Sequence, residues 1–493
     1  MFSKPPPPPT QPPDGVHIIP CTGIDLGPRR MVVTTGLIID GRLDPKKLET
    51  SLSSLIAEKF PRAGARLAFR NGVYEFHIPH AFDAHTPPVV FTAEDHPEPY
   101  ASPARPSIEH LRRSSPSEPW LCTLPVLDEY FRSSTCPSMT DQYLFPNTPL
   151  LHVHVSIFDD LTFLGVTSSH ILTNALGIGT LLQAWTRLLT GGALDDIQGM
   201  PWDMQPFKPF TVKPDSRTKI PIMRGMFKLG VFATISFIMR FMWRFWREPK
   251  EDVKLVRVPK VFLEERKRTI MDELTAEGSS EWVGNSDVLM GWWLQTLYAH
   301  RSDTKPVHIL LPVNLRDEPI YPSDLGPELT SLSAPFINNA VSAIPVPPLT
   351  PYALRTSSLR VVAQHFRRAI NAWRADPVGI QSDLRWRCSY PLKALFPCPP
   401  GAEYAVQTSW RAAKFGELDF SGALQFASSG TQERQKARVV GVIPMMTSNR
   451  NRPMRGGGAV LMEDQGSVWL SAVSSVKDWG AMRKTGVIKF LEV

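Results

Sequence analysis

The chain has 493 residues, of which 42% are hydrophobic and 20% charged, and its formal net charge is +7. This is an ordinary globular composition, and the length predicts two or three domains. The basic residues are spread along the chain, which argues against a nucleic-acid-binding protein and fits a polyphosphate ligand at least as well. The five cysteines lie far apart without a C-x-x-C pair, so we expect no disulfide framework, no metal site and a cytoplasmic protein.

The N-terminus is rich in proline and includes an unbroken run from Pro5 to Pro9. It lacks the long apolar stretch of a signal peptide, so residues 1–15 are predicted to form a disordered, polyproline-type lead. The rest of the chain is predicted to divide into three parts. These are an N-terminal domain over residues 16–200, a hydrophobic crossover linker over 201–254 and a C-terminal domain over 255–493.

The first predicted unit is a strand followed by a helix. Residues 31–40 are β-branched and apolar, which predicts a buried strand, and residues 44–57 repeat leucines at helical spacing. Residues 150–167 alternate on both sides of an Asp-Asp turn and predict a hairpin that ends just before His170. A helix is predicted over residues 174–189, where two glycines follow the last apolar position. His170 is therefore expected between the end of a strand and the start of a helix.

The second half begins with another strand near Leu255. A charged helix is predicted over residues 263–277, a second helix over 286–300 and a strand over 308–314. The same alternation of strands and helices therefore continues through the second half.

The segment from Ser169 to Gly177 reads S-H-I-L-T-N-A-L-G. It resembles the H-x-x-x-D-G signature of the plant and fungal acyltransferases known as the BAHD superfamily. Six further segments resemble other motifs of the family and occur in the order that the family requires. They are residues 58–67 (F-P-x-L-A-G-R-L), 286–292 (S-x-N-D-V-x-x-A-x-x-W), 313–316 (V-N-x-R), 336–341 (Y-F-G-N-A), 408–411 (S-W) and 417–422 (D-F-G-W-G). Such ordered matches are hard to obtain by chance, and they are closer to the fungal members that acylate secondary metabolites.

The resemblance implies a two-domain α/β fold similar to chloramphenicol acetyltransferase, with a channel between the domains. In that fold His170 would be the general base, acyl-CoA the cosubstrate and a small molecule the acceptor. We expect transfer of an acyl group, acetyl first of all, to a hydroxyl of a bulky metabolite such as a terpenoid or polyketide. The family pattern implies that Trp410, with Thr408 or Ser409 beside it, lies near the oxyanion on the thioester carbonyl. We expect a monomer without a bound cofactor.

Five residues of the family pattern are taken as structural: Asn174, Arg316, Asn339, Asp419 and Gly422. Asn174 replaces the family's aspartate, which by resemblance pairs with an arginine, here Arg316. An amide still accepts a hydrogen bond but forfeits its charge-assisted part, so we expect lost rigidity and not lost chemistry. The late loop from Asp419 to Gly422 lacks the family's tryptophan, which is expected to change the channel's shape more than the activity. Asn339 lies in the segment that resembles Y-F-G-N-A.

Competing readings of the same residues remain open. A histidine after a strand is by itself more often a packed or capping residue, so the role of His170 depends on the ordered matches. His152 and His154 alternate with valines and are predicted to be cross-strand partners at the surface. A second hypothesis is a catalytically silent family member that acts as a binding or scaffold protein. A serine hydrolase is disfavoured because the chain has no G-x-S-x-G elbow.

Residues 220–246 are far more apolar than a domain linker should be. The uninterrupted apolar stretch from Leu229 to Met239 is too short to cross a bilayer unless Lys228 and Arg240 snorkel from its ends. We therefore expect this segment to lie on the cytosolic face of a membrane, or to dip into it and return, with its arginines at the phosphates. The alternative is a helix that packs on the protein's own surface.

Overall fold

The computed structural model describes residues 14–112, 117–211, 220–321, 335–425, 436–448 and 455–491. The predicted proline-rich lead, residues 1–15, therefore falls almost entirely outside the described residues.

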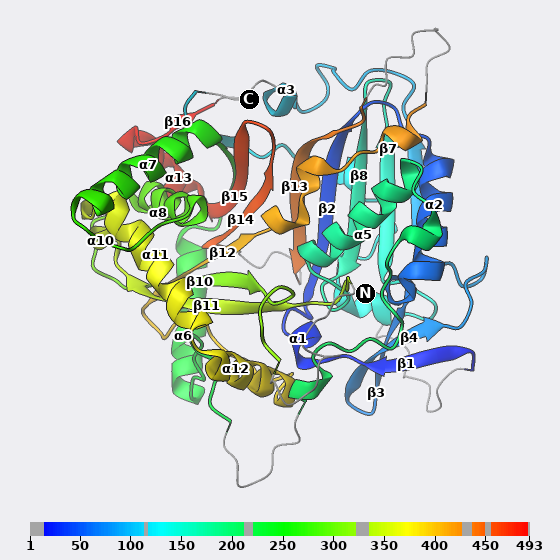
Figure 1. Cartoon of the computed structure of the whole chain (residues 1–493), viewed down its shortest axis with the longest axis horizontal. Helices are drawn as coiled ribbons and strands as arrows, with labels where there is room; N and C mark the ends of the chain where they lie inside the picture. Colours follow the sequence, from blue (N-terminus) through cyan, green and yellow to red (C-terminus); the bar gives the residue numbers. More distant parts are fainter. Residues whose placement is uncertain are drawn as a thin grey trace.

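A five-stranded sheet forms the core of one half of the molecule. Its strand order is β13 (Val439–Ser448), β2 (Met31–Asp40), β8 (Leu161–Ser169), β7 (Leu151–Ile157) and β5 (Val90–Asp95). All neighbours are antiparallel except β5 and β7. The helices α2 (Pro45–Lys59) and α5 (Ala175–Leu189) contact each other and cover one face of this sheet (Figure 1). The predicted strand at 31–40, the hairpin and both helices are confirmed.

An eight-stranded sheet forms the other half. Its order is β11 (Val341–Leu349), β10 (Val307–Asn314), β12 (Glu403–Ser409), β14 (Gly457–Glu463), β15 (Ser467–Ser475), β9 (Glu251–Pro259), β6 (Trp120–Thr123) and β16 (Lys489–Phe490). Its helices are α7 (Lys260–Ala276), α8 (Asn285–Tyr298), α10 (Pro351–Thr356), α11 (Leu359–Arg374), α12 (Pro377–Ser389) and α13 (Val476–Thr485). The predicted strands near 255 and at 308–314 are present as β9 and β10, and the two predicted helices as α7 and α8.

Smaller elements complete the N-terminal half. A three-stranded sheet has the order β1 (Val16–Pro20), β4 (Val73–Pro79) and β3 (Arg66–Arg70), and the short helices are α1 (Gly23–Leu26), α3 (Glu109–Arg112) and α4 (Asp128–Phe131). The helix α1 follows β1 directly and contacts α12 of the second half. This contact brings the start of the chain to the boundary between the two halves.

The two large sheets exchange strands across the predicted domain boundaries. β6 comes from the first half of the sequence but pairs with β9 of the eight-stranded sheet. β13 comes from the second half but forms the edge of the five-stranded sheet, where it pairs antiparallel with β2. The domain limits at residues 200 and 255 thus stay predictions, and the sheets do not follow them.

The prediction that His152 and His154 lie at the surface is wrong. Their side chains are only 7% and 3% exposed, because β7 lies between β8 and β5 and every residue of β7 is buried. The histidines do face cross-strand partners, and His154 Nδ1 lies 2.8 Å from Thr92 Oγ1. Burial lowers the pKa of His152 to about 4, so its imidazole is neutral at physiological pH.

Candidate active site

His170 occupies the connection between β8 and α5. Its backbone amide donates to the carbonyl of Met31 over 2.8 Å, which extends the β8–β2 pairing by one residue beyond the strand. Four residues later, Asn174 caps α5 by accepting a hydrogen bond from the amide of Gly177 over 2.9 Å. The strand and the helix cap therefore fix both ends of the loop that carries the imidazole.

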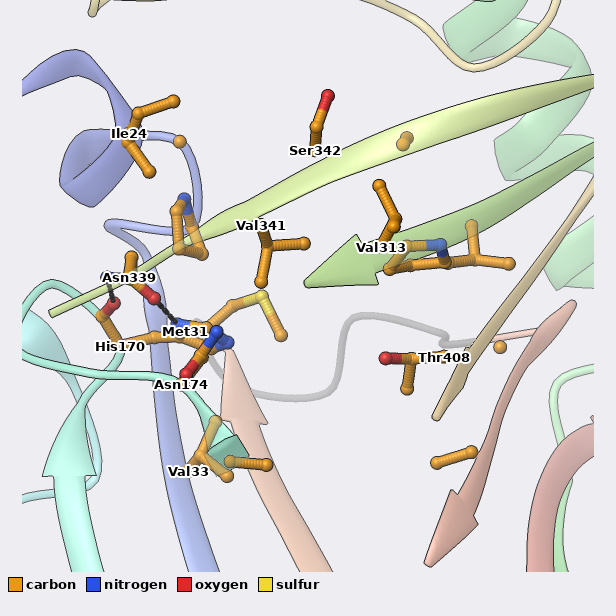
Figure 2. A pocket seen from close by; sticks show the side chains of 18 of the residues that line it. Ile24, Met31, Val33, His170, Asn174, Val313, Asn339, Val341, Ser342 and Thr408 are labelled. Carbon is orange, nitrogen blue, oxygen red and sulfur yellow. Dashed lines mark hydrogen bonds between the residues drawn. The ribbon is translucent and has the colours of Figure 1, made fainter. Parts of the chain in front are cut away.

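A cavity of about 860 Å³ opens beside His170. Residues from both halves line it, including His170 and Val33 on one side and Val313, Val341, Ser342 and Thr408 on the other. Figure 2 shows Thr408 on β12 facing His170 across this space. The cavity thus has the position that the family resemblance implies for an interdomain channel.

Asn339 fixes the orientation and the tautomer of His170. Its side-chain Nδ2 donates to the carbonyls of His170 and Ile171 over 2.6 and 3.1 Å, which turns Oδ1 toward the imidazole. Oδ1 lies 3.1 Å from His170 Nδ1, and a dashed line marks this hydrogen bond in Figure 2. Since an amide oxygen only accepts, Nδ1 must carry the proton, and the lone pair of the neutral imidazole is left on Nε2.

Burial adjusts the basicity of His170. The loss of solvent disfavours the imidazolium and lowers the pKa of His170 below its ordinary value, while the bond to Asn339 acts in the opposite direction. The imidazole is therefore neutral at physiological pH. A neutral imidazole with a free Nε2 lone pair is the form that a general base requires.

The predicted pairing of Asn174 with Arg316 is present. Arg316 Nη2 donates to Asn174 Oδ1 over 3.2 Å and to the carbonyl of Asn338 over 2.6 Å. The Arg316 guanidinium also stacks over the ring of Phe336 at 4.8 Å, and burial lowers its pKa to about 10. Arg316 thus joins the histidine loop to the segment that carries Asn339.

The amide group of Asn174 is only half satisfied. Its Nδ2 is buried and finds no hydrogen-bond partner in the described part of the chain. A buried donor without an acceptor costs about 1–3 kcal/mol, so the amide is a poor replacement for a carboxylate here.

Substituting Asn174→Asp is expected to keep or raise the thermal unfolding midpoint. In the variant, one carboxylate oxygen takes the place of the unpaired Nδ2. The other takes the place of Oδ1 and accepts a charge-assisted hydrogen bond from Arg316. Asn174→Ala is the matched control, and loss of the helix cap should cost about 1 kcal/mol. Thermal melting of the three proteins decides the question. A clearly lower midpoint for Asn174→Asp than for the wild type would contradict the proposed role of the pair.

Trp410, Thr408 and Ser409 line the wall of the cavity opposite His170. β12 ends at Ser409, and the amide of Trp410 donates to the carbonyl of Val460 over 2.7 Å. Trp410 is 7% exposed, and the hydrogen bond of its amide to Val460 joins this turn to β14. Their place on the wall fits the expected position near a thioester carbonyl.

Asp419 and Gly422 lie away from the cavity. Asp419 Oδ1 accepts a hydrogen bond from the amide of Ser421 within the same loop, over 2.9 Å. Gly422 packs against the end of α5, where a Cβ atom would lie 1.8 Å from the carbonyl oxygen of Leu189. The loop supports the helix that follows His170, which agrees with its interpretation as structural.

Sequence reasoning missed Asp25, a buried carboxyl group near Asn339. Asp25 is 1% exposed and accepts hydrogen bonds from the amide and the hydroxyl of Thr22 over 2.9 and 2.7 Å. Burial raises the pKa of Asp25 to about 6, against the opposing effects of Thr22, Arg62 and Asn339. The T-x-x-D spacing from Thr22 to Asp25 is a capping-box signal that marks the helix start, but it does not reveal the contact with Asn339.

No protein-family profile matches the chain. Individual relatives match along most of its length. Acetyltransferase adrJ of Penicillium roqueforti is 27% identical over 512 residues, which cover 98% of this chain and 97% of adrJ. Transcriptional regulator calD of Penicillium decumbens is 25% identical over 436 residues, which cover 85% of this chain and 84% of calD.

Solved structures show the same fold. TRI101 of F. sporotrichioides, determined with coenzyme A and T-2, has a TM-score of 0.63 at 15% identity, and the match covers 94% of this chain and 96% of TRI101. Vinorine synthase has a TM-score of 0.55 at 14% identity, with 98% and 96% covered. The predicted two-domain α/β fold is thereby confirmed. The chain thus carries, in order, motifs that resemble those of the BAHD acyltransferases, is similar to the acetyltransferase adrJ along nearly its whole length and has the fold of TRI101 and vinorine synthase.

Proposed function

We propose that the protein transfers an acyl group, acetyl first of all, from acyl-CoA to a hydroxyl of a bulky secondary metabolite. The observation that carries this proposal is the state of His170: a neutral imidazole, held by Asn339 with its Nε2 lone pair free, beside a cavity of about 860 Å³. A cavity of this volume is within the usual range of small-molecule sites. The name of adrJ and the coenzyme A bound by TRI101 support the same chemistry.

The reaction needs one base and one charge-stabilising group. Nε2 of His170 takes the proton of the acceptor hydroxyl while the hydroxyl oxygen attacks the thioester carbonyl carbon. The oxyanion that forms is stabilised by donors on the opposite wall, where Thr408 and Trp410 carry a hydroxyl and an indole N–H. The C–S bond then breaks, and the departing CoA sulfur takes the proton from the imidazolium. The products are an ester and free CoA thiol.

The acid limb of the pH–rate profile is expected to lie below the ordinary pKa of imidazole. A lowered pKa keeps His170 unprotonated to lower pH, so kcat/KM should fall only when the pH drops through that lowered value and stay level above it. Measuring kcat/KM with acetyl-CoA over the acid and neutral range checks this. If the acid limb lies above the ordinary pKa of imidazole, either a different group is the base or a charged neighbour raises the pKa of His170.

The proposed activity is tested by thiol release. The protein is incubated with acyl-CoAs of increasing chain length and with hydroxylated terpenoid, polyketide and alkaloid acceptors, and each product is identified by its mass. An acceptor-dependent release of CoA with a mass gain of one acyl group supports the proposal. If only a nitrogen is acylated, the acceptor group is an amine and not a hydroxyl. If CoA is released without any acylated product, the activity is thioester hydrolysis.

A second candidate is a silent member of the family that binds a ligand without turnover. Asn174 in place of the family's aspartate and the likeness to a relative named as a transcriptional regulator favour it. The ordered geometry of His170 and Asn339 argues against it. Calorimetric binding of CoA or of an acceptor, together with no acyl transfer in the thiol-release test, would select this candidate.

A further inference from the structure

The helix α6 (Val231–Arg247) presents an apolar face that the described residues leave open. None of its 17 residues is buried. Figure 1 shows α6 beyond β10 and β11, on the side away from the five-stranded sheet. Its large exposed apolar side chains are Val231, Phe232, Ile235, Ile238, Met239, Met242, Trp243 and Trp246. Phe232 is 89% exposed and Trp246 is 78% exposed. Contact of such large apolar side chains with water is unfavourable, and exposed apolar patches of this kind mark interaction sites.

These side chains share one side of the helix. Their spacing of three and four residues places them in a single stripe along the axis. The opposite side is attached to the protein, because the ring of Phe237 lies 4.9 Å from that of Phe396 and Arg244 forms an ion pair with Glu403 at 3.2 Å. The helix is thus held in place with its apolar stripe turned outward.

The charges within the segment that carries the stripe are all positive. The segment 220–247 contains five basic residues and no aspartate or glutamate. Arg224 and Arg244 are used in ion pairs with neighbouring carboxylates, whereas Lys228, Arg240 and Arg247 are exposed beside the stripe. Exposed cations next to an exposed apolar face call for a partner that offers both anionic groups and a nonpolar interior.

We infer that α6 docks the protein on the surface of a membrane that contains anionic lipids. The apolar stripe would enter the boundary between headgroups and acyl chains, and Lys228, Arg240 and Arg247 would meet lipid phosphates. A second copy of the chain fits less well, because α6 offers no carboxylate to pair with the cations of a facing α6. Among the described helices, none combines the length and hydropathy that a membrane crossing requires. At about 1.5 Å per residue α6 is about 25 Å long, which suits a helix that lies flat.

The attached side of α6 is linked to one wall of the His170 cavity. Met223 and Met226, just before α6, line the cavity, and so does Leu395. Phe227 and Phe396 then pair in an isolated bridge, and Phe396 also contacts α6. Docking through α6 would hold this wall near the membrane, so a lipophilic acceptor that partitions into the lipid would be concentrated close to the cavity. This step depends on the proposed acyl transfer, whereas the docking itself does not.

Flotation of the full chain tests the docking. Vesicles of phosphatidylcholine alone are compared with vesicles of equal parts phosphatidylcholine and phosphatidylserine. The wild type is expected to float with the anionic vesicles only and to be released by high salt. The combined variant Phe232→Ser, Ile235→Ser, Met239→Ser and Trp246→Ser is expected to lose at least about tenfold in bound fraction.

The matched control carries Val361→Ser and Val378→Ser, two exposed apolar side chains on α11 and α12, and should float like the wild type. Circular dichroism shows whether each variant is folded, and acyl transfer to a water-soluble acceptor measures the active site separately. Wild type that stays in the dense fraction with anionic vesicles overturns the docking. So does a wild-type dimer that the α6 variant converts to a monomer, because the stripe would then be a contact between two copies. Docking without acyl transfer would refute only the proposed function.

Discussion

Replacing His170 by alanine is expected to lower the rate of acyl transfer about 10²–10⁴-fold, which is the usual contribution of a positioned general base. The side chain lies between the end of β8 and the cap of α5, and it faces the cavity with Nε2 free. Its backbone bond to Met31 does not involve the imidazole, so the substitution removes the base and leaves the loop in place.

Two measurements accompany the rate for His170→Ala. Circular dichroism should match that of the wild type, and calorimetry should show that CoA still binds, since binding does not need the imidazole. A folded variant that keeps more than about a tenth of the wild-type rate would show that His170 is not the base.

Asn339→Leu is expected to lower kcat about 10²-fold, because the imidazole then loses its fixed orientation and tautomer. Leucine has a similar size but neither accepts from Nδ1 nor donates to the carbonyls of His170 and Ile171. KM for acetyl-CoA should change much less than kcat, since Asn339 acts on His170 and not on the cosubstrate. A positioning role predicts this split.

Asn339→Asp provides the second test of the same role. A carboxylate still accepts from Nδ1, but its negative charge favours the imidazolium and raises the pKa of His170. The acid limb of the pH–rate profile should therefore move to higher pH. Asn338→Ala is the matched control, because the contact of Asn338 with Arg316 uses the backbone carbonyl, and its profile should stay unchanged. An unshifted profile for Asn339→Asp would show that Asn339 has only a structural role.

Local patterns in the sequence predicted the elements that carry the site. The strand over residues 31–40 agrees with β2, and Asn174 caps the helix where the periodic apolar residues begin. Such features depend on neighbours in the sequence, which is why alternation and capping reveal them. The family resemblance singled out His170, Asn174, Arg316 and Asn339, and all four meet in the structure.

Contacts between distant parts of the chain were not predictable in the same way. The bond that fixes the tautomer of His170 joins residues 169 positions apart. The burial of His152 depends on the tertiary packing around β7, in which every residue is buried, and a single strand's alternation does not report that packing. The apolar composition of 220–246 likewise indicated a hydrophobic face, but only the structure shows that this face is open while the other is anchored by Phe396 and Glu403.

The exchange of β13 between the two halves makes them interdependent as folding units. β13 covers β2 from Met31 to Ile39, and β2 is a long strand with mostly buried side chains. A fragment that ended before β13 would leave the amides and carbonyls of that edge unpaired, and such an edge recruits strands from other molecules. Fragments of the two halves are therefore expected to aggregate when produced separately and to recover a soluble form only when produced together.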